Sequence, residues 1–192
     1  MNDTRAVVRL KPKSAPRKIR RGFPWVYAGE LVTDRRTKAL TQGAIATLED
    51  AERRPLATVA VNPDSKIFAR VLDHDPEAQI DRAWLTARLR AALALREAAF
   101  DAPFYRLVHA EGDGLAGVII DRFGDAVVIQ PNAAWAEVLF DDLVAAVTEV
   151  CGVTCVVKSA SGRARGLEGL DDVSGVVAGT LAGAVPVVMN GA

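Results

Sequence analysis

Hydrophobic and polar residues alternate in the first third of the chain, in short runs separated by turn-forming residues. The runs lie within AVVRLKP, AIATLED, PLATVAVNP and KIFARVLD, which begin at Ala6, Ala44, Pro55 and Lys66. Alternation with a period of two residues is typical of half-buried β-strands. Several short strands at this close spacing predict a small β-barrel or sandwich.

The pattern changes after the polar run DHDPEAQ, which Pro76 interrupts. From Asp81 to about Phe100 the spacing of apolar residues becomes helical, and Asp81 can cap the first turn. The apolar positions on this stripe are Ile80, Ala83, Trp84, Ala87, Ala91, Ala94, Leu95 and Ala98. The sequence therefore predicts an amphipathic helix that connects two units.

Strand-like and helix-like runs alternate after Pro103. FYRLVHAE, GVIID and AVVIQ are typical of strands, AAWAEVLFDDLVAAVTEV of one amphipathic helix, and VTCVVKS of a further strand. SGRARGLEGLDDVSG is expected to form a glycine-rich loop, and GVVAGT and VPVVMNG to be extended. We predict a mixed α+β fold, with a barrel over residues 1–75, a connecting helix over 76–100, and a β-β-α-β-β domain over 101–192.

Composition limits the class of protein. Half of the 192 residues are hydrophobic, no run of about 18 uncharged apolar residues occurs, and the basic N-terminus lacks the apolar core of a signal peptide. We therefore expect a cytoplasmic protein without a membrane segment. Cys151 and Cys155 are too few for a disulfide framework and are interpreted as buried small hydrophobes. His74 and His109 are isolated, so no metal site is expected.

The net charge of zero conceals an asymmetry along the chain. Residues 1–38 contain eleven Lys and Arg against three acids, which leaves this segment at +8 and the remainder at −8. Such a division predicts one basic face that meets a polyanion, in front of a neutral to acidic body. A basic surface that is simply solvated is the alternative.

The phrase EGDGLAGVIID contains Gly112, Gly114 and Gly117 at the spacing of a dinucleotide-binding loop. Such a loop must open a helix, whose first free N–H groups bind the pyrophosphate. Here Gly117 leads into the β-branched run Val118–Ile120, and the only acid near the ribose-binding distance is Glu137, inside a predicted helix. We interpret these glycines as a tight connection between two strands.

Three phrases identify a family resemblance. GFPWVYAGEL, VAVNPDSKIFARVL and YRLVHAEGDGLAGVIIDRFGDAVVIQ resemble the N-terminal half of class I SAM-dependent large-subunit ribosomal RNA methyltransferases, the cytosine-C5 enzymes that begin with a PUA domain. The resemblance implies a PUA barrel, then a strand-strand-helix-strand-strand domain, then a Rossmann-like methyltransferase domain. It implies ribosomal RNA as partner.

The chain ends where the resemblance places the start of the third domain. In VPVVMNGA, Met189 stands where relatives show the acid of a Glu-Asn-Gly-like phrase. No SAM-binding glycine loop or catalytic cysteine motif is present, so we expect SAM to bind in the absent domain and these residues alone to be non-catalytic. Either the chain is part of a longer enzyme, or it is a short relative without catalysis.

The stretch PRKIRRGFPWVY supplies the strongest candidates for contact with RNA. Its cations can neutralise phosphates, and an exposed aromatic ring can stack on an unpaired base. Barrel core is the alternative for Trp25 and Phe23, with Pro24 fixing a turn. It is the more typical role for Trp25, whereas Tyr27 is equally compatible with either role. Gly22 and Lys66 are rim positions by resemblance, although ordinary surface is the alternative. The full set of candidates is Arg17, Lys18, Arg20, Arg21, Gly22, Tyr27, Lys66 and Arg70.

The second unit offers structural rather than catalytic candidates. Glu111, Asp113, Gly114 and Gly117 are expected to form turns or interdomain contacts, because no nucleophile or metal cluster accompanies the carboxylates. Asp113 is a candidate to face the absent domain. The predicted function is RNA recognition for a ribosomal RNA (cytosine-C5) methyltransferase. The alternatives are a stand-alone RNA-binding or ribosome-assembly module, and a protein-interaction or homodimerisation module.

Overall fold

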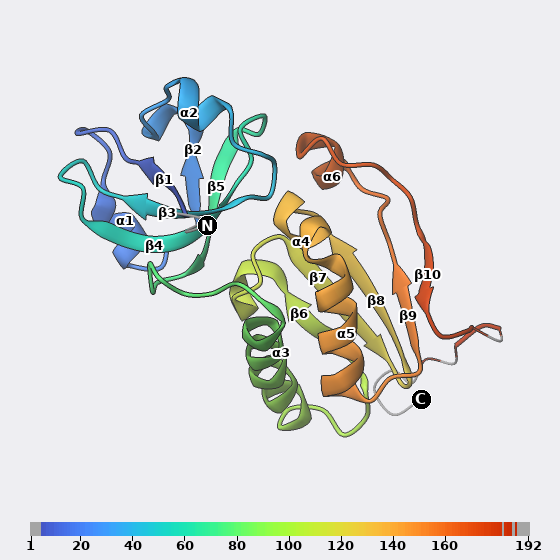
Figure 1. Cartoon of the computed structure of the whole chain (residues 1–192). Helices are drawn as coiled ribbons and strands as arrows, with labels where there is room; N and C mark the ends of the chain where they lie inside the picture. Colours follow the sequence, from blue (N-terminus) through green and yellow to red (C-terminus); the bar gives the residue numbers. More distant parts are fainter. Residues whose placement is uncertain (1–4, 182, 186, 188–192) are drawn as a thin grey trace.

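The computed structural model describes residues 5–181, 183–185 and 187. Two five-stranded sheets form two units that lie against each other (Figure 1). The elements of the first unit are β1 (Ala6–Arg9), α1 (Pro16–Arg20), β2 (Trp25–Tyr27), the 3-10 turn η1 (Ala28–Glu30), α2 (Arg35–Lys38), β3 (Ile45–Glu49), β4 (Pro55–Val61) and β5 (Ile67–Asp73). The predicted mixed α+β fold is confirmed.

The first sheet curls into a barrel. Its strand order is β1-β3-β4-β5-β2, with β1 and β3 parallel and the other pairs antiparallel. A bridge between Leu10 and Leu31 joins the segment after β1 to the segment after β2, so the two edges of the sheet meet. Leu10, Ile19 and Leu31 are buried in the barrel core together with Val8, Leu48 and Val59 of the alternating strands.

The second unit consists of a sheet with helices on one face (Figure 1). Its elements are α3 (Arg82–Glu97), β6 (Phe104–His109), the 3-10 turn η2 (Ala110–Asp113), β7 (Val118–Phe123), β8 (Ala126–Pro131), α4 (Ala134–Val138), α5 (Phe140–Cys151), β9 (Cys155–Lys158), α6 (Arg163–Leu167) and β10 (Gly175–Ala178). The strand order is β10-β9-β8-β7-β6, and among the described strands of this sheet only β8 and β9 pair in parallel.

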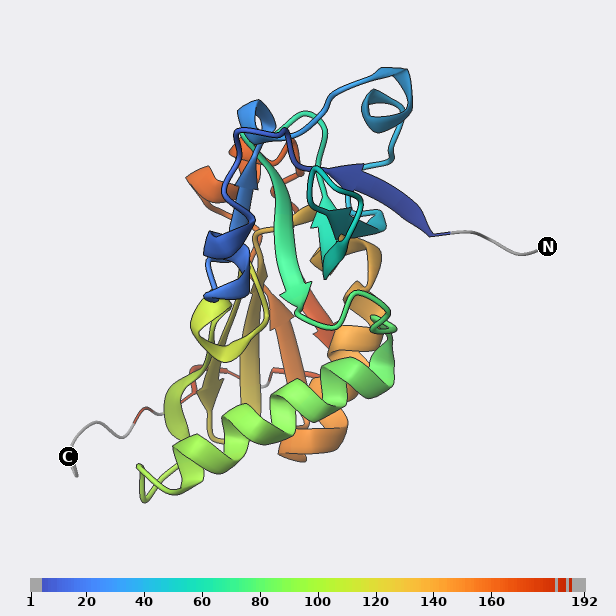
Figure 2. The same cartoon turned by 90° about the vertical axis from the view of Figure 1, so that its left-hand side faces the viewer.

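The connecting helix α3 belongs in space to this second unit. Asp81 caps it by accepting a hydrogen bond from the Trp84 backbone N–H at 2.9 Å, as predicted. Its buried face carries Leu85 and Leu89, which share a core with the second sheet, and the helix packs beside α5 (Figure 2). Ala60 and Leu72 of the barrel join the same core, so the two units share a packed boundary.

Two expectations about helices are corrected. The helix predicted over residues 133–150 is broken at Leu139, where φ is −103° and ψ is 23°. The break lets α4 pack against β4 of the barrel while α5 packs against α3. The glycine-rich stretch predicted as a loop contains the short helix α6. The expected extended segment VPVVMNG and the junction at Met189 lie largely outside the described residues.

Candidate nucleic-acid interface

Four of the candidate residues for RNA contact line one depression on the barrel. Arg17, Lys18, Arg21 and Gly22 surround it together with Phe23, and its volume is about 570 Å³. Pro16 begins α1 at a position where its missing N–H costs no hydrogen bond, and the buried Ile19 anchors the helix to the barrel. The helix therefore presents its cations outward, around a surface whose lining contains no carboxylate.

Gly22 permits the turn that follows α1. Its φ is +90°, a conformation that side-chain-bearing residues rarely adopt, while no atom lies within 4 Å of the position a Cβ would occupy. The backbone of Gly22 is therefore open to the depression. Glycine is required there because of the positive φ and not because of a close neighbour.

Several other cations of residues 1–38 lie away from this depression. Arg20 pairs with Asp50 at 3.3 Å, and α2, which carries Arg35 and Arg36, lies at another corner of the barrel in both views (Figures 1 and 2). The expectation of a single basic face is thus corrected, because Arg20 is paired with Asp50 and α2 lies away from α1 (Figures 1 and 2). Burial alone would raise the pKa of Asp50, but hydrogen bonds from Arg54 lower it overall, so this carboxylate stays ionised.

Lys18 connects the depression with a second concave surface. Its ammonium pairs with Glu30 and lies 4.8 Å from the centre of the Phe23 ring and 5.7 Å from that of Tyr27. Phe23 lines the depression, whereas Tyr27 lines a cleft of about 700 Å³ between the barrel and the second unit. The two concave surfaces therefore meet at this lysine.

The cleft has apolar walls. They are formed by Trp25, Tyr27, Ile67, Ile119 and Leu167, with the exposed Lys66 also among the lining residues. The expectation that Trp25 belongs to the barrel core is corrected, and Phe23, for which the core was the alternative, is exposed. Trp25 is only half-buried, Phe23 is 38% exposed, and their rings make an edge-to-face contact at the rim of the two surfaces.

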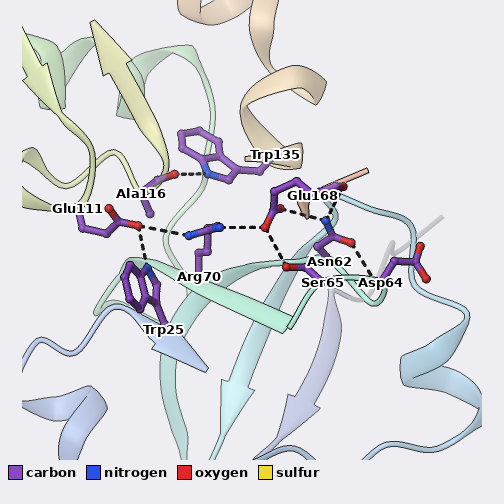
Figure 3. A network of polar contacts seen from close by, with 9 residues as sticks. All are labelled: Trp25, Asn62, Asp64, Ser65, Arg70, Glu111, Ala116, Trp135 and Glu168. Atoms are coloured by element: carbon purple, nitrogen blue, oxygen red, sulfur yellow. Dashed lines mark hydrogen bonds and ion pairs between the residues drawn. The ribbon is translucent and has the colours of Figure 1, made fainter. Parts of the chain in front are cut away.

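A network of polar contacts crosses the floor of the cleft (Figure 3). Glu111 of the second unit accepts hydrogen bonds from the Trp25 indole N–H at 2.8 Å and from the Arg70 guanidinium at 3.4 Å, both on its Oε1 atom. Arg70 also donates to Glu168 at 2.9 Å. Glu111 thus makes an interdomain contact, while Arg70, a candidate for RNA contact, is held by two carboxylates.

Glu168 was not among the candidates, yet it binds three donors from the barrel. Besides Arg70, the side chains of Asn62 and Ser65 donate to its carboxylate, each at 3.0 Å, and its own side chain is 4% exposed. A buried charge must be paired and hydrogen-bonded, and these contacts satisfy both needs. No local pattern marked Glu168, because its partners are distant in sequence.

Arg165 fixes the segment that carries Glu168. It lies in the stretch that was expected to form a glycine-rich loop, but it is 1% exposed. Its guanidinium donates to the carbonyls of Pro131 at 2.5 Å and Asp171 at 2.7 Å and pairs with Glu137. Glu137, the acid weighed as a ribose ligand, is therefore a structural partner of Arg165.

The glycine phrase forms the predicted connection between strands. Gly114 and Gly117 have φ of +73° and +77°, and β7 begins directly after Gly117. A Cβ on Gly117 would lie 2.7 Å from that of Ala133, so close approach also demands glycine there. Because a strand follows the phrase, it lacks the helix N-terminus that a dinucleotide phosphate requires. We therefore place no SAM contact on these glycines, and a cofactor site elsewhere in a longer protein stays a prediction.

Asp113 stabilises the turn and the neighbouring helix. Its carboxylate accepts from the backbone N–H of His109 and from Arg96 of α3, each at 2.6 Å. The side chain is 9% exposed, so it faces α3. That Asp113 also faces a further domain stays a prediction.

The cysteines are buried, as predicted. Burial raises the pKa of the Cys151 thiol, which disfavours the reactive thiolate. Within the described part of the chain, no group of three metal-ligating side chains lies together, and no helix is long and apolar enough to cross a membrane.

Comparison with known proteins agrees with this architecture. Residues 8–74 match the family model of a PUA-like domain. Over 172 residues the chain is 34% identical to ribosomal RNA large subunit methyltransferase I of Cronobacter sakazakii and 33% identical to that of Escherichia coli O157:H7. In each case the match covers 88% of this chain and 43% of the relative. The chain thus spans less than half the length of these relatives.

Solved structures share the fold. A candidate SAM-dependent methyltransferase from Streptococcus mutans superposes with a TM-score of 0.75 at 19% identity, over 97% of this chain and 46% of its own. A candidate methyltransferase crystallised with SAH gives a TM-score of 0.65 at 19% identity, over 81% of this chain and 40% of its own. Residues 8–74 are therefore similar to a PUA-like domain, and the chain is similar to part of ribosomal RNA large subunit methyltransferase I.

Proposed function

We propose that this chain is the RNA-recognition portion of a ribosomal RNA (cytosine-C5) methyltransferase of the cytoplasm. Methyl transfer from SAM belongs, in this proposal, to a catalytic domain in a longer protein. The observation that carries the proposal is the depression beside α1, where Arg17 and Arg21 converge with Lys18, whose ammonium pairs with Glu30, and where no carboxylate is among the lining residues. Similarity to ribosomal RNA methyltransferases supports ribosomal RNA as the polyanion.

The depression suits a phosphodiester backbone physically. Arg17 and Arg21 are exposed, so each can displace a condensed counterion from a phosphate without first breaking a buried contact. The open backbone at Gly22 lets a strand approach closely. Contacts of this kind position RNA without reading its sequence.

Salt-dependent binding tests this proposal. The affinity of the 192-residue chain for a fluorescent fragment of ribosomal RNA is measured by anisotropy at several salt concentrations. Each of Arg17→Ala and Arg21→Ala is expected to reduce the slope of log K against log salt by about one.

Arg35→Ala and Arg36→Ala serve as matched controls, because these arginines lie on α2 at another corner of the barrel. They are expected to leave the slope nearly unchanged. Binding no tighter than that of an acidic control protein, or equal slopes for the α1 and α2 variants, would refute the proposal.

Protein interaction is a second candidate function, favoured by one feature of the second sheet. On β10, Val176 and Val177 are 48% and 43% exposed, and Val177 lines a depression with Phe140 and Val144 of α5. Exposed valines on a sheet edge are able to bind a partner strand or a second copy. Sedimentation of the wild type and of Val176→Lys tests this: self-association that the lysine abolishes would support it.

A further inference from the structure

The cleft between the two units differs in chemistry from the depression beside α1. Its volume of about 700 Å³ is within the range of small-ligand sites, and aromatic and aliphatic side chains form its walls. Tyr27 is 40% exposed there. An exposed aromatic ring in a concave site is a stacking platform for a flat, uncharged group.

The charges of the cleft exclude phosphate. Its lining residues include three acids, Asp64, Glu111 and Glu168, against two cations, Lys66 and Arg70. Arg70 already pairs with two of these carboxylates, so it offers little charge to a further anion. The site therefore favours a neutral ring over a phosphate group.

The cleft lies next to the surface proposed for phosphates. Lys18 touches the depression on one side, and its ammonium lies over the Tyr27 ring on the other. A single strand whose phosphates rest against α1 can thus turn one unstacked base toward Tyr27. Proteins usually recognise RNA sequence through unpaired bases that are exposed in this way.

Glu111 supplies a hydrogen-bond acceptor inside the cleft. Its Oε1 atom accepts from Trp25 and Arg70, whereas within the described residues no hydrogen bond reaches Oε2 (Figure 3). A carboxylate oxygen accepts from the exocyclic amine of cytosine, adenine or guanine. Uracil has only an N3–H, flanked by two carbonyl oxygens that the carboxylate repels.

We infer that the cleft binds one unpaired nucleobase bearing an exocyclic amine, which stacks on Tyr27 and donates to Glu111. This inference rests on the proposed function, because the base arrives on a strand held by α1. It assigns base discrimination to the boundary between the two units, whereas the barrel surface supplies affinity for phosphates.

The test compares short oligocytidine with oligouridine, whose bases are equal in ring size, in the anisotropy assay. Tyr27→Ala is expected to weaken oligocytidine binding about 5- to 100-fold without changing the salt slope. Tyr27→Phe keeps the ring and should bind like the wild type. Phe100→Ala is the matched control, because Phe100 is also an exposed aromatic residue but lines neither surface.

Base preference is tested through Glu111→Gln, which keeps an oxygen for Trp25 and Arg70 but places a donor in the cleft. The wild type is expected to prefer oligocytidine about tenfold, and the variant to lose that preference. If Tyr27→Ala and Phe100→Ala behave alike and both oligomers bind equally, the inference is wrong while salt-dependent binding keeps the proposed function. If neither oligomer nor ribosomal RNA binds, both fail.

Discussion

Replacing Glu168 with Gln removes a buried negative charge from the boundary between the two units. All three side chains that contact its carboxylate are donors: Asn62 at 3.0 Å, Ser65 at 3.0 Å and Arg70 at 2.9 Å. A Gln side chain has one oxygen and one NH₂ group, so its NH₂ must face at least one of these donors. Arg70 then retains only Glu111 as a negatively charged partner, at the longer distance of 3.4 Å.

The expected loss of stability follows from these contacts. Breaking one partner of a buried ion pair costs about 3–5 kcal/mol, because the other charge stays buried. Glu111 still compensates part of the Arg70 charge, and Gln still accepts one hydrogen bond. We therefore expect Glu168→Gln to lower the free energy of unfolding by about 3 kcal/mol, which is roughly a hundredfold in the equilibrium constant.

Urea unfolding followed by tryptophan fluorescence measures this loss, since the Trp25 indole donates to Glu111 in the same network. The matched control is Glu52→Gln, which removes an exposed carboxylate paired with Arg54 on the surface. Exposed ion pairs contribute about 0–1 kcal/mol to stability, so the control should change the free energy of unfolding very little. If the two variants differ by less than about 0.5 kcal/mol, the network does not stabilise the boundary and the reasoning is refuted.

Three further predictions concern other contacts. Gly43→Ala should destabilise the protein by about 2 kcal/mol in urea, because φ is +79° and the new Cβ would lie 2.8 Å from the Ala134 carbonyl; wild-type stability would contradict this. Burial alone would raise the pKa of Asp73, but hydrogen bonds, including that from Arg88, lower it below the usual 3.8. The stability that ionised Asp73 contributes to the folded state is therefore present above pH 3.8, and it is lost as the pH falls through the lowered pKa. Asp73→Asn should cost about 1–2 kcal/mol at neutral pH, and the difference from wild type should shrink in acid; a constant difference would argue against it. Finally, Cys151 should react with a thiol reagent only after urea unfolding, because burial raises its pKa; rapid labelling of the folded protein would be inconsistent with that.

The sequence could predict the elements whose signals are local. Asp81 stands one residue before the periodic run that becomes α3, so the cap and the helix were visible together. Gly117 precedes three β-branched residues, which indicated a strand where a nucleotide-binding loop would need a helix. The cations of α1 lie within five consecutive positions, Arg17–Arg21, so their proximity in space follows from the chain itself.

The floor of the cleft could not be predicted in the same way. Arg70 lies on an ordinary alternating strand, and its partners Glu111 and Glu168 are 41 and 98 residues away. The helix α6 depends on Arg165 reaching Pro131 and Asp171, whereas its sequence is rich in glycine and typical of a loop. In both cases tertiary contacts override local preference, and no pattern in a single sequence records them.

The chain order of the Arg70 network has a consequence for how a ribosome makes the protein. All five barrel strands have been synthesised once Asp73 emerges, whereas Glu168 follows almost a hundred residues later. Domains generally fold as units, beginning at the N-terminus, during translation. In the nascent barrel the Arg70 guanidinium is therefore still hydrated. The complete boundary between the two units can form only after Glu168 has left the exit tunnel.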